Sequence, residues 1–132
     1  MKVLNLIIKQ KYFEAILDGR KVQEFREVRP TTIKKLLQLD EDGYEIVDEE
    51  LNSLPIKYDA IRFFVGYNKD RDSALVEVKG AYCECFADEN GNIITYEYGK
   101  DENGEPVVWT AEQVVYELGK ILEVKRNRDK SQ

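Results

Sequence analysis

The 132-residue sequence contains no histidine, and it has only two cysteines, three prolines and one tryptophan. Without histidine, the chain cannot form a serine–histidine or cysteine–histidine nucleophile or an imidazole metal site. A single residue separates Cys83 from Cys85, and cysteines at this spacing rarely form a disulfide. A structural zinc site needs about four Cys or His ligands, and the chain has only these two cysteines. We therefore expect no metal, no cofactor and two reduced thiols.

Long hydrophobic segments are also absent from the sequence. No apolar run approaches the ~20 residues that span a bilayer, and the N-terminus lacks the apolar segment and cleavage site of a signal peptide. These absences predict a cytoplasmic protein with no membrane partner. The length and the 42% hydrophobic content predict a single domain over residues 1–132 with its own core.

Negative charge predominates, but it is unevenly distributed along the chain. The formal net charge is −6, which argues against broad non-specific binding to nucleic acid. Residues 1–39 hold nine Lys or Arg and four Asp or Glu, whereas residues 40–59 hold eight acids and one Lys. This distribution predicts either a local anion-binding face in the N-terminal third or an uneven surface charge without a partner.

The hydrophobic pattern predicts many strands and two helices near the N-terminus. Strands are expected at residues 3–9, 21–29, 60–67, 74–86, 93–98, 107–109 and 114–125, with Asn-Gly hairpin turns at 90–91 and 103–104. A helical period followed by Gly19 predicts a helix over 10–18, and Thr31 or Thr32 can cap a second helix that runs to Leu39. We therefore expect an α+β fold with a mostly antiparallel sheet, and closing that sheet into a small barrel would remove its exposed edges.

Three segments differ from this pattern. Residues 40–58 are acidic and weakly periodic, which predicts an insertion with a short helix near 49–54. Residues 110–113 predict one helical turn, and the polar residues 126–132 predict a frayed tail. The insertion at 40–58 is a candidate surface for a protein partner, or simply a solvated acidic surface.

The run from Gly19 to Arg26 is the most informative part of the sequence. Gly19 ends the expected helix, and a strand follows. Residues two apart on a strand point the same way, so Glu24 and Arg26 share a face. Val22 and Val28 flank them, which indicates a partly enclosed face where charges are normally paired. Glu24 and Arg26 therefore form either a ligand site, in which Arg26 binds an anion through two hydrogen bonds, or a structural ion pair.

Several neighbouring residues can extend such a site. Lys21 stands at the helix–strand corner, where a desolvated lysine can act as a base or nucleophile, or remain solvated. Glu24 can accept a hydrogen bond from the exocyclic amino group of a base. Lys9 and Arg29 can extend a basic rim, and Tyr67 can stack on a base, although each also fits an ordinary surface position.

The motif and its surroundings resemble a known family. Four residues in this order are similar to the motif of the ASCH domain family: Gly19, Lys21, Glu24 and Arg26. Four segments are similar to parts of phage and prophage members of that family: 6–18, 26–30, 62–67 and 118–122. The resemblance touches most of the chain, and it implies a PUA-like, mostly antiparallel β-barrel with two N-terminal helices.

The same resemblance implies a role with RNA or with a modified nucleotide. Some small bacterial ASCH proteins are amidohydrolases that remove the acetyl group from N4-acetylcytidine with a lysine, a threonine and a glutamate. In this chain Lys21 matches the lysine, whereas Glu24 occupies the threonine position. An enzyme of this kind would use Lys21 and Glu24 as catalytic residues, with water or Lys21 as the nucleophile.

Three hypotheses for the function follow from the sequence. In the first, the chain is a binding module for RNA, a nucleotide or a nucleoside, with a cleft formed by Lys9, Lys21, Glu24, Arg26, Arg29 and Tyr67. The second is a hydrolase that acts on a modified nucleobase amide. The third is a protein-interaction module of phage origin that works through residues 40–58.

Overall fold

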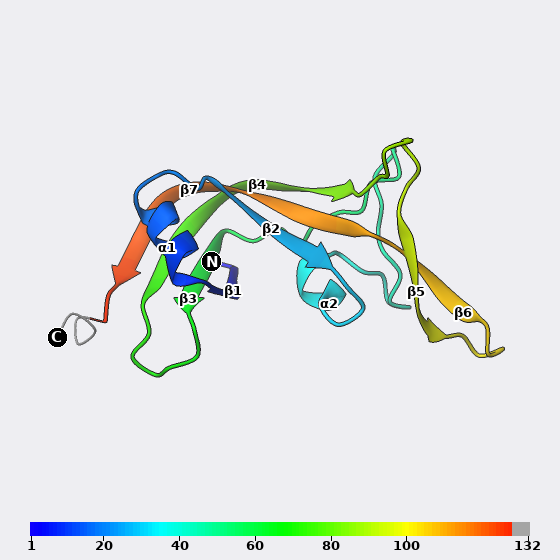
Figure 1. Ribbon diagram of the computed structural model, residues 1–132, viewed down its shortest axis with the longest axis horizontal. Helices are drawn as coiled ribbons and strands as arrows, with labels where there is room; N and C mark the ends of the chain where they lie inside the picture. Colours follow the sequence, from blue (N-terminus) through cyan, green and yellow to red (C-terminus); the bar gives the residue numbers. More distant parts are fainter. Residues whose placement is uncertain (128–132) are drawn as a thin grey trace. The chain divides into compact units, whose positions relative to one another are not determined.

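The computed structural model describes residues 1–127, which form an α+β fold of mainly strands with two short helices (Figure 1). The elements in chain order are β1 (Val3–Ile8), α1 (Gln10–Leu17), β2 (Gln23–Val28), α2 (Ile33–Leu36), β3 (Ala60–Val65), β4 (Ser73–Cys85), β5 (Thr95–Lys100), β6 (Pro106–Thr110) and β7 (Glu112–Lys125). The predicted α+β class and the two N-terminal helices are confirmed.

The chain divides into two compact units. Unit 1 consists of Met1–Glu24, Lys57–Ala81 and the described residues from Tyr116 onward, and unit 2 consists of Phe25–Ile56 and Tyr82–Val115. The strands β2, β4 and β7 contribute residues to both units.

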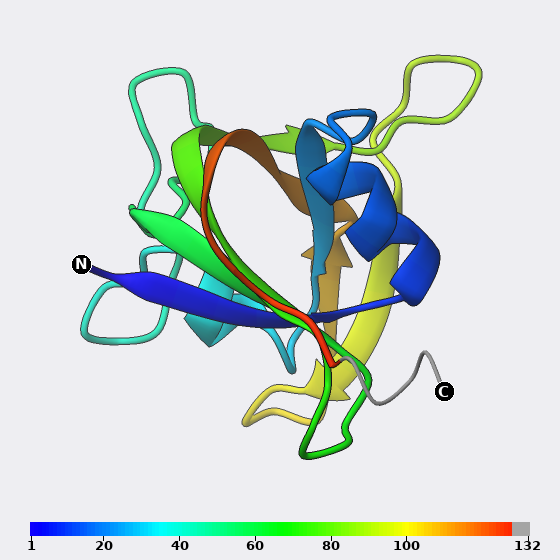
Figure 2. The same ribbon diagram turned by 90° about the vertical axis from the view of Figure 1, so that its left-hand side faces the viewer.

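The strands form a five-stranded sheet in the order β1-β3-β4-β7-β2 and a separate β5-β6 hairpin. Within unit 1, β1 runs parallel to β3, and β3 is antiparallel to β4 (Figure 2). The expected antiparallel pairing is therefore confirmed for β3–β4 and for β5–β6, but not for the first strand. The described pairings leave β1 and β2 as the end strands, so they do not close the sheet into the expected barrel.

The core of unit 1 follows from the two periodicities in the sequence. Alternate residues of β1 and the apolar face of α1 are buried, together with β3 residues: Leu4, Leu6, Ile8, Phe13, Ile16, Ala60, Ile61 and Phe63. The helix ends because Gly19 adopts a positive φ of 84° and donates its N–H to the carbonyl of Ile16. The reversal continues with a hydrogen bond of 3.0 Å from the Lys21 N–H to the Ala15 carbonyl, which directs the chain toward β2.

Two predictions about unit 2 are wrong. The segment 40–58 contains no helix near 49–54; single antiparallel bridges join Leu39 to Glu45 and Val47 to Ser53 instead. Residues 110–113 are not a helical turn either, because the Ala111 N–H bonds the Ile94 carbonyl and its own carbonyl accepts from Phe86. At 49–54 a short loop closed by the Val47–Ser53 bridge replaces the expected helix, whereas at 110–113 pairing with distant residues overrides the local pattern.

The first two residues of the predicted frayed tail, 126–132, make defined contacts with distant residues. Arg126 forms an ion pair of 2.7 Å with Glu14, and the Asn127 N–H donates to Asp72 at 2.7 Å. Residues 128–132 of that prediction lie outside the described residues.

One five-residue turn occurs four times among residues 1–127. In each case the first residue is an aspartate whose Oδ1 accepts from the N–H groups two and four positions later: Asp40, Asp48, Asp88 and Asp101. The fourth position has a positive φ, and three of the turns place glycine there. The exception is Leu51, which adopts a φ of 66° with its side chain 79% exposed.

Replacing Leu51 with glycine should therefore stabilise the protein. A non-glycine residue in the left-handed region costs about 1–2 kcal/mol, part of which is offset by the greater chain entropy of glycine, so we expect a net gain of about 0.5–1 kcal/mol in the free energy of unfolding. Urea unfolding of Leu51→Gly measures this gain. The matched change is Gly91→Leu at the same turn position, which should destabilise; a loss of stability in Leu51→Gly would show that the leucine side chain makes contacts that outweigh the strain.

Candidate functional site

The motif residues of unit 1 form an ion pair at the start of β2. Glu24 is buried, with 5% of its surface exposed, and its Oε1 lies 3.1 Å from Nζ of Lys21. The Lys21 side chain is 18% exposed, so both charges are largely removed from water. A buried carboxylate needs such a partner, because leaving it unpaired costs several kcal/mol.

An exposed tyrosine lies against this ion pair. Nζ of Lys21 is 5.6 Å from the ring centre of Tyr12, and Nζ of Lys11 is 4.9 Å from the same ring. Tyr12 is on α1, and the Gly19 reversal brings Lys21 back beside that helix. Tyr12 belongs to the apolar stripe of α1 in sequence, yet 43% of it is exposed. We call Tyr12, Lys21 and Glu24 the Lys21 cluster.

The remaining predicted site residues are Lys9, Arg26, Arg29 and Tyr67. Lys9 is exposed just before α1, and Tyr67 is 86% exposed after β3; the contacts that define the Lys21 cluster include neither. Arg26 and Arg29 belong to unit 2. Arg26 is half-buried on β2, whereas Arg29 is exposed, donates to Glu27 at 2.6 Å and lies over a tyrosine ring. Of the predicted face, Glu24 and Val28 are buried, while Val22 is 58% exposed.

A second charged arrangement, which the sequence did not reveal, lies within unit 2. Glu112, at the start of β7, is 6% exposed, and it shares hydrogen bonds with Glu45 and Ser53. The Ser53 hydroxyl also donates to Oε2 of Glu45. Burial, followed by the charge and hydrogen bond of Glu45, raises the pKa of Glu112 to about 7, while the bond to Ser53 opposes the shift. We call Glu45 and Glu112 the carboxyl pair.

The sequence did contain one signal for this pair. Glu112, Val114 and Tyr116 alternate along β7, which places Glu112 on the buried face of the strand. Glu45, by contrast, is one of many acids in its segment, and it is positioned by the bridge to Leu39 and by the hydrogen bond from Ser53.

The carboxyl pair also affects the two cysteines of β4. Burial, followed by the charges of Glu112 and Glu45, raises the pKa of Cys83 to about 12 and raises that of Cys85 as well. Thiols with a raised pKa stay protonated at neutral pH and are poor nucleophiles.

The space beside the carboxyl pair is small. A cavity of about 60 Å³ is lined by Glu27, Val28, Arg29, Phe86, Tyr96, Ala111 and Glu112. A protonated carboxyl next to a carboxylate can in principle exchange protons near neutral pH. A cavity of this size can hold a water molecule or two but no nucleotide, so the pair has no room for a substrate of that class.

Neither a metal site nor a membrane-spanning helix is found in the described part of the chain. Among residues 1–127, no three or more Cys, Asp or Glu side chains are arranged to hold a metal ion. No helix in the same residues is long and apolar enough to cross a membrane.

No family model matches the chain, and neither the curated proteins nor the solved structures provide a match. The resemblance to the ASCH domain therefore depends on the motif residues and on the helix–turn–strand that carries them.

The carboxyl pair should make stability depend on pH. Because the folded state raises the pKa of Glu112 from 4.5 to about 7, folded protein binds more protons than unfolded protein in this range, and stability falls as pH rises through it. Glu112→Gln keeps a hydrogen-bonding side chain but does not titrate. In this variant we expect the free energy of unfolding to decrease less as the pH rises. At pH 8 we expect the variant to be more stable than wild type by on the order of 2–3 kcal/mol.

Urea unfolding at several pH values between 4.5 and 8 measures this difference. The control is Glu97→Gln, which removes an exposed carboxylate of β5 and should leave the wild-type slope unchanged. An unchanged slope in Glu112→Gln would mean that Glu112 titrates normally in the folded protein.

Proposed function

We propose that the chain binds a nucleotide or single-stranded RNA through the Lys21 cluster. The observation that carries this proposal is a half-buried, ion-paired ammonium beside an exposed aromatic ring. The cluster thus combines a cation, a hydrogen-bond acceptor and a stacking surface within unit 1.

Each group suits one part of a nucleotide. The ring of Tyr12 offers a stacking surface, and base–aromatic stacking contributes about 1–3 kcal/mol per base. The ammonium groups of Lys11 and Lys21 lie 4.9 Å and 5.6 Å from the centre of that ring, where they can attract a phosphate. Glu24 accepts hydrogen bonds only, which favours a base with an exocyclic amino group, such as cytosine or adenine.

The resemblance to the ASCH domain supports the same ligand class. Gly19, Lys21 and Glu24 occupy a helix–turn–strand in the order typical of that family, whose PUA-like barrels often bind RNA or modified bases. We propose that the sheet belongs to such a PUA-like barrel and that the protein is a phage-type member. A cytoplasmic location is part of this proposal and is consistent with two protonated thiols.

The hydrolase hypothesis receives less support from the geometry. A nucleophilic lysine needs its amine free to attack the substrate, whereas Nζ of Lys21 is held 3.1 Å from the Glu24 carboxylate. Glu24 is itself engaged in that ion pair and replaces the family's threonine. A binding role is therefore the better description of the cluster.

Tyr12→Ala should weaken nucleotide binding by about five- to 100-fold, because it removes the stacking surface. Lys21→Gln combined with Glu24→Gln should weaken it too, and this double variant avoids a buried unpaired charge. The ligands are cytidine, cytidine monophosphate, N4-acetylcytidine and short single-stranded RNAs, measured by thermal shift and calorimetry.

Lys69→Gln is the control, since it removes one exposed positive charge of unit 1 in the β3–β4 turn and should leave the affinity unchanged. Chromatography of N4-acetylcytidine after incubation tests for turnover in the same samples. Wild type that binds none of these ligands, or a Tyr12→Ala variant with wild-type affinity, would contradict the proposal.

A further inference from the structure

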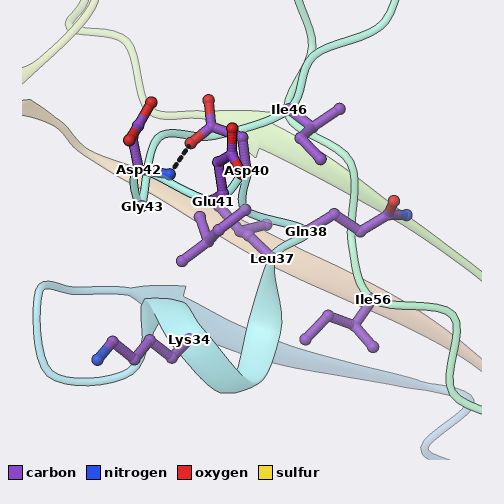
Figure 3. Close-up of a pocket in the computed structure, with 10 residues that line it drawn as sticks. Lys34, Leu37, Gln38, Asp40, Glu41, Asp42, Gly43, Ile46 and Ile56 are labelled. Atoms are coloured by element: carbon purple, nitrogen blue, oxygen red, sulfur yellow. Dashed lines mark hydrogen bonds between the residues drawn. The ribbon is translucent and has the colours of Figure 1, made fainter.

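A groove of about 700 Å³ lies on unit 2, between α2 and the segment that follows it (Figure 3). Its lining combines apolar side chains with charged ones. In Figure 3, Lys34 extends from α2 on one side and the acidic turn lies on the other, with Leu37, Ile46 and Ile56 between and beside them. We call it the acidic groove.

The apolar floor is held in place by backbone hydrogen bonds. The Ile46 N–H donates to Gln38 at 3.1 Å, and the Ile56 N–H donates to Leu36 at 2.9 Å. Leu37 is 1% exposed, whereas Ile46 remains 38% exposed. The groove is therefore formed in the free protein, and part of its apolar surface faces solvent.

The rim on one side carries a concentrated negative charge. Asp40, Glu41 and Asp42 line the groove, and the turn they form is fixed by hydrogen bonds from the N–H groups of Asp42 and Tyr44 to Oδ1 of Asp40. Residues 40–50 contain seven acids and no lysine or arginine. These carboxylates repel a phosphate backbone and attract a cation.

Tyr44, next to this rim, adds an aromatic surface. Its side chain is 73% exposed, although a tyrosine of this size is normally at least half covered. An arginine guanidinium can lie on such a ring while it pairs with a neighbouring carboxylate.

We propose that the acidic groove binds a segment of a partner protein that presents an apolar side chain flanked by arginine or lysine. The apolar side chain contacts Leu37, Ile46 and Ile56, and the basic side chains pair with Glu41 and Asp42. Charge complementarity selects this occupant over nucleic acid, and the apolar floor selects it over a simple inorganic cation. This site takes cations and lies in unit 2, so its failure would leave the anion-binding proposal for unit 1 intact.

The test begins with a display library of short random peptides, selected against the immobilised full chain. We expect the enriched peptides to share an apolar residue flanked by arginine or lysine. A synthetic copy of the most enriched peptide is then titrated by fluorescence anisotropy. Enrichment without basic residues, or no enrichment, would overturn the proposal.

Matched variants then locate the binding site. Glu41→Gln combined with Asp42→Asn should weaken peptide binding about three- to tenfold, and Ile46→Ser should weaken it by a similar factor. The control combines Glu89→Gln with Glu102→Gln, which removes two charges at equivalent positions of the recurring turn, and it should keep nearly the wild-type affinity. An equal loss in the control would show general charge attraction and overturn the proposal.

Sedimentation of the free chain distinguishes a partner protein from a second copy of this chain as the occupant of the groove. A monomer whose peptide affinity falls in the groove variants supports a partner protein. Self-association that disappears in those same variants would make a second copy of this chain the occupant, and the proposal as stated would be wrong.

Discussion

The free-energy cost of removing a carboxylate from water governs the polar structure of both units. Glu24 is paired with the Lys21 ammonium, and Glu112 is held beside Glu45 with a raised pKa. Asp72, which is 2% exposed, accepts from the Gln10 side chain at 3.0 Å and from a backbone N–H near the end of β7. Asp72 and Glu112 thus take partners from distant parts of the chain, whereas the partner of Glu24 lies three residues before it.

This constraint also separates the two candidate surfaces by their chemistry. In unit 1, the Lys21 cluster places an ion-paired ammonium beside an aromatic ring, which suits the proposed ligand, an anion with a planar base. In unit 2, acids line the rim of the acidic groove, which suits the proposed basic segment. The two proposals therefore assign ligands of opposite charge to the two units.

The local elements were largely predictable because their signals are local. The periodicity of α1, the Gly19 stop, the alternating strands and the Asn-Gly turns depend on neighbouring residues, and the structure contains them close to the expected positions. The errors fell at 49–54, where a short bridged loop replaces the expected helix, and at 110–113, where distant backbone partners determine the conformation. The site was predicted in part: Lys21 and Glu24 come together, whereas Tyr12 and the carboxyl pair were not expected.

The sequence by itself determined the α+β class, the order of most elements and the absence of histidine chemistry, since these follow from composition and short-range periodicity. Only the tertiary structure decided which charges meet. The ammonium of Lys21 lies beside Tyr12 because a left-handed glycine reverses the chain after α1. Glu45 and Glu112 are more than sixty residues apart in the sequence, yet their carboxyl groups meet in the fold. The bridge from Leu39 to Glu45 helps to hold Glu45 in place. Pairing over such intervals depends on chain topology, and a one-dimensional pattern of hydrophobic and charged residues does not encode it directly.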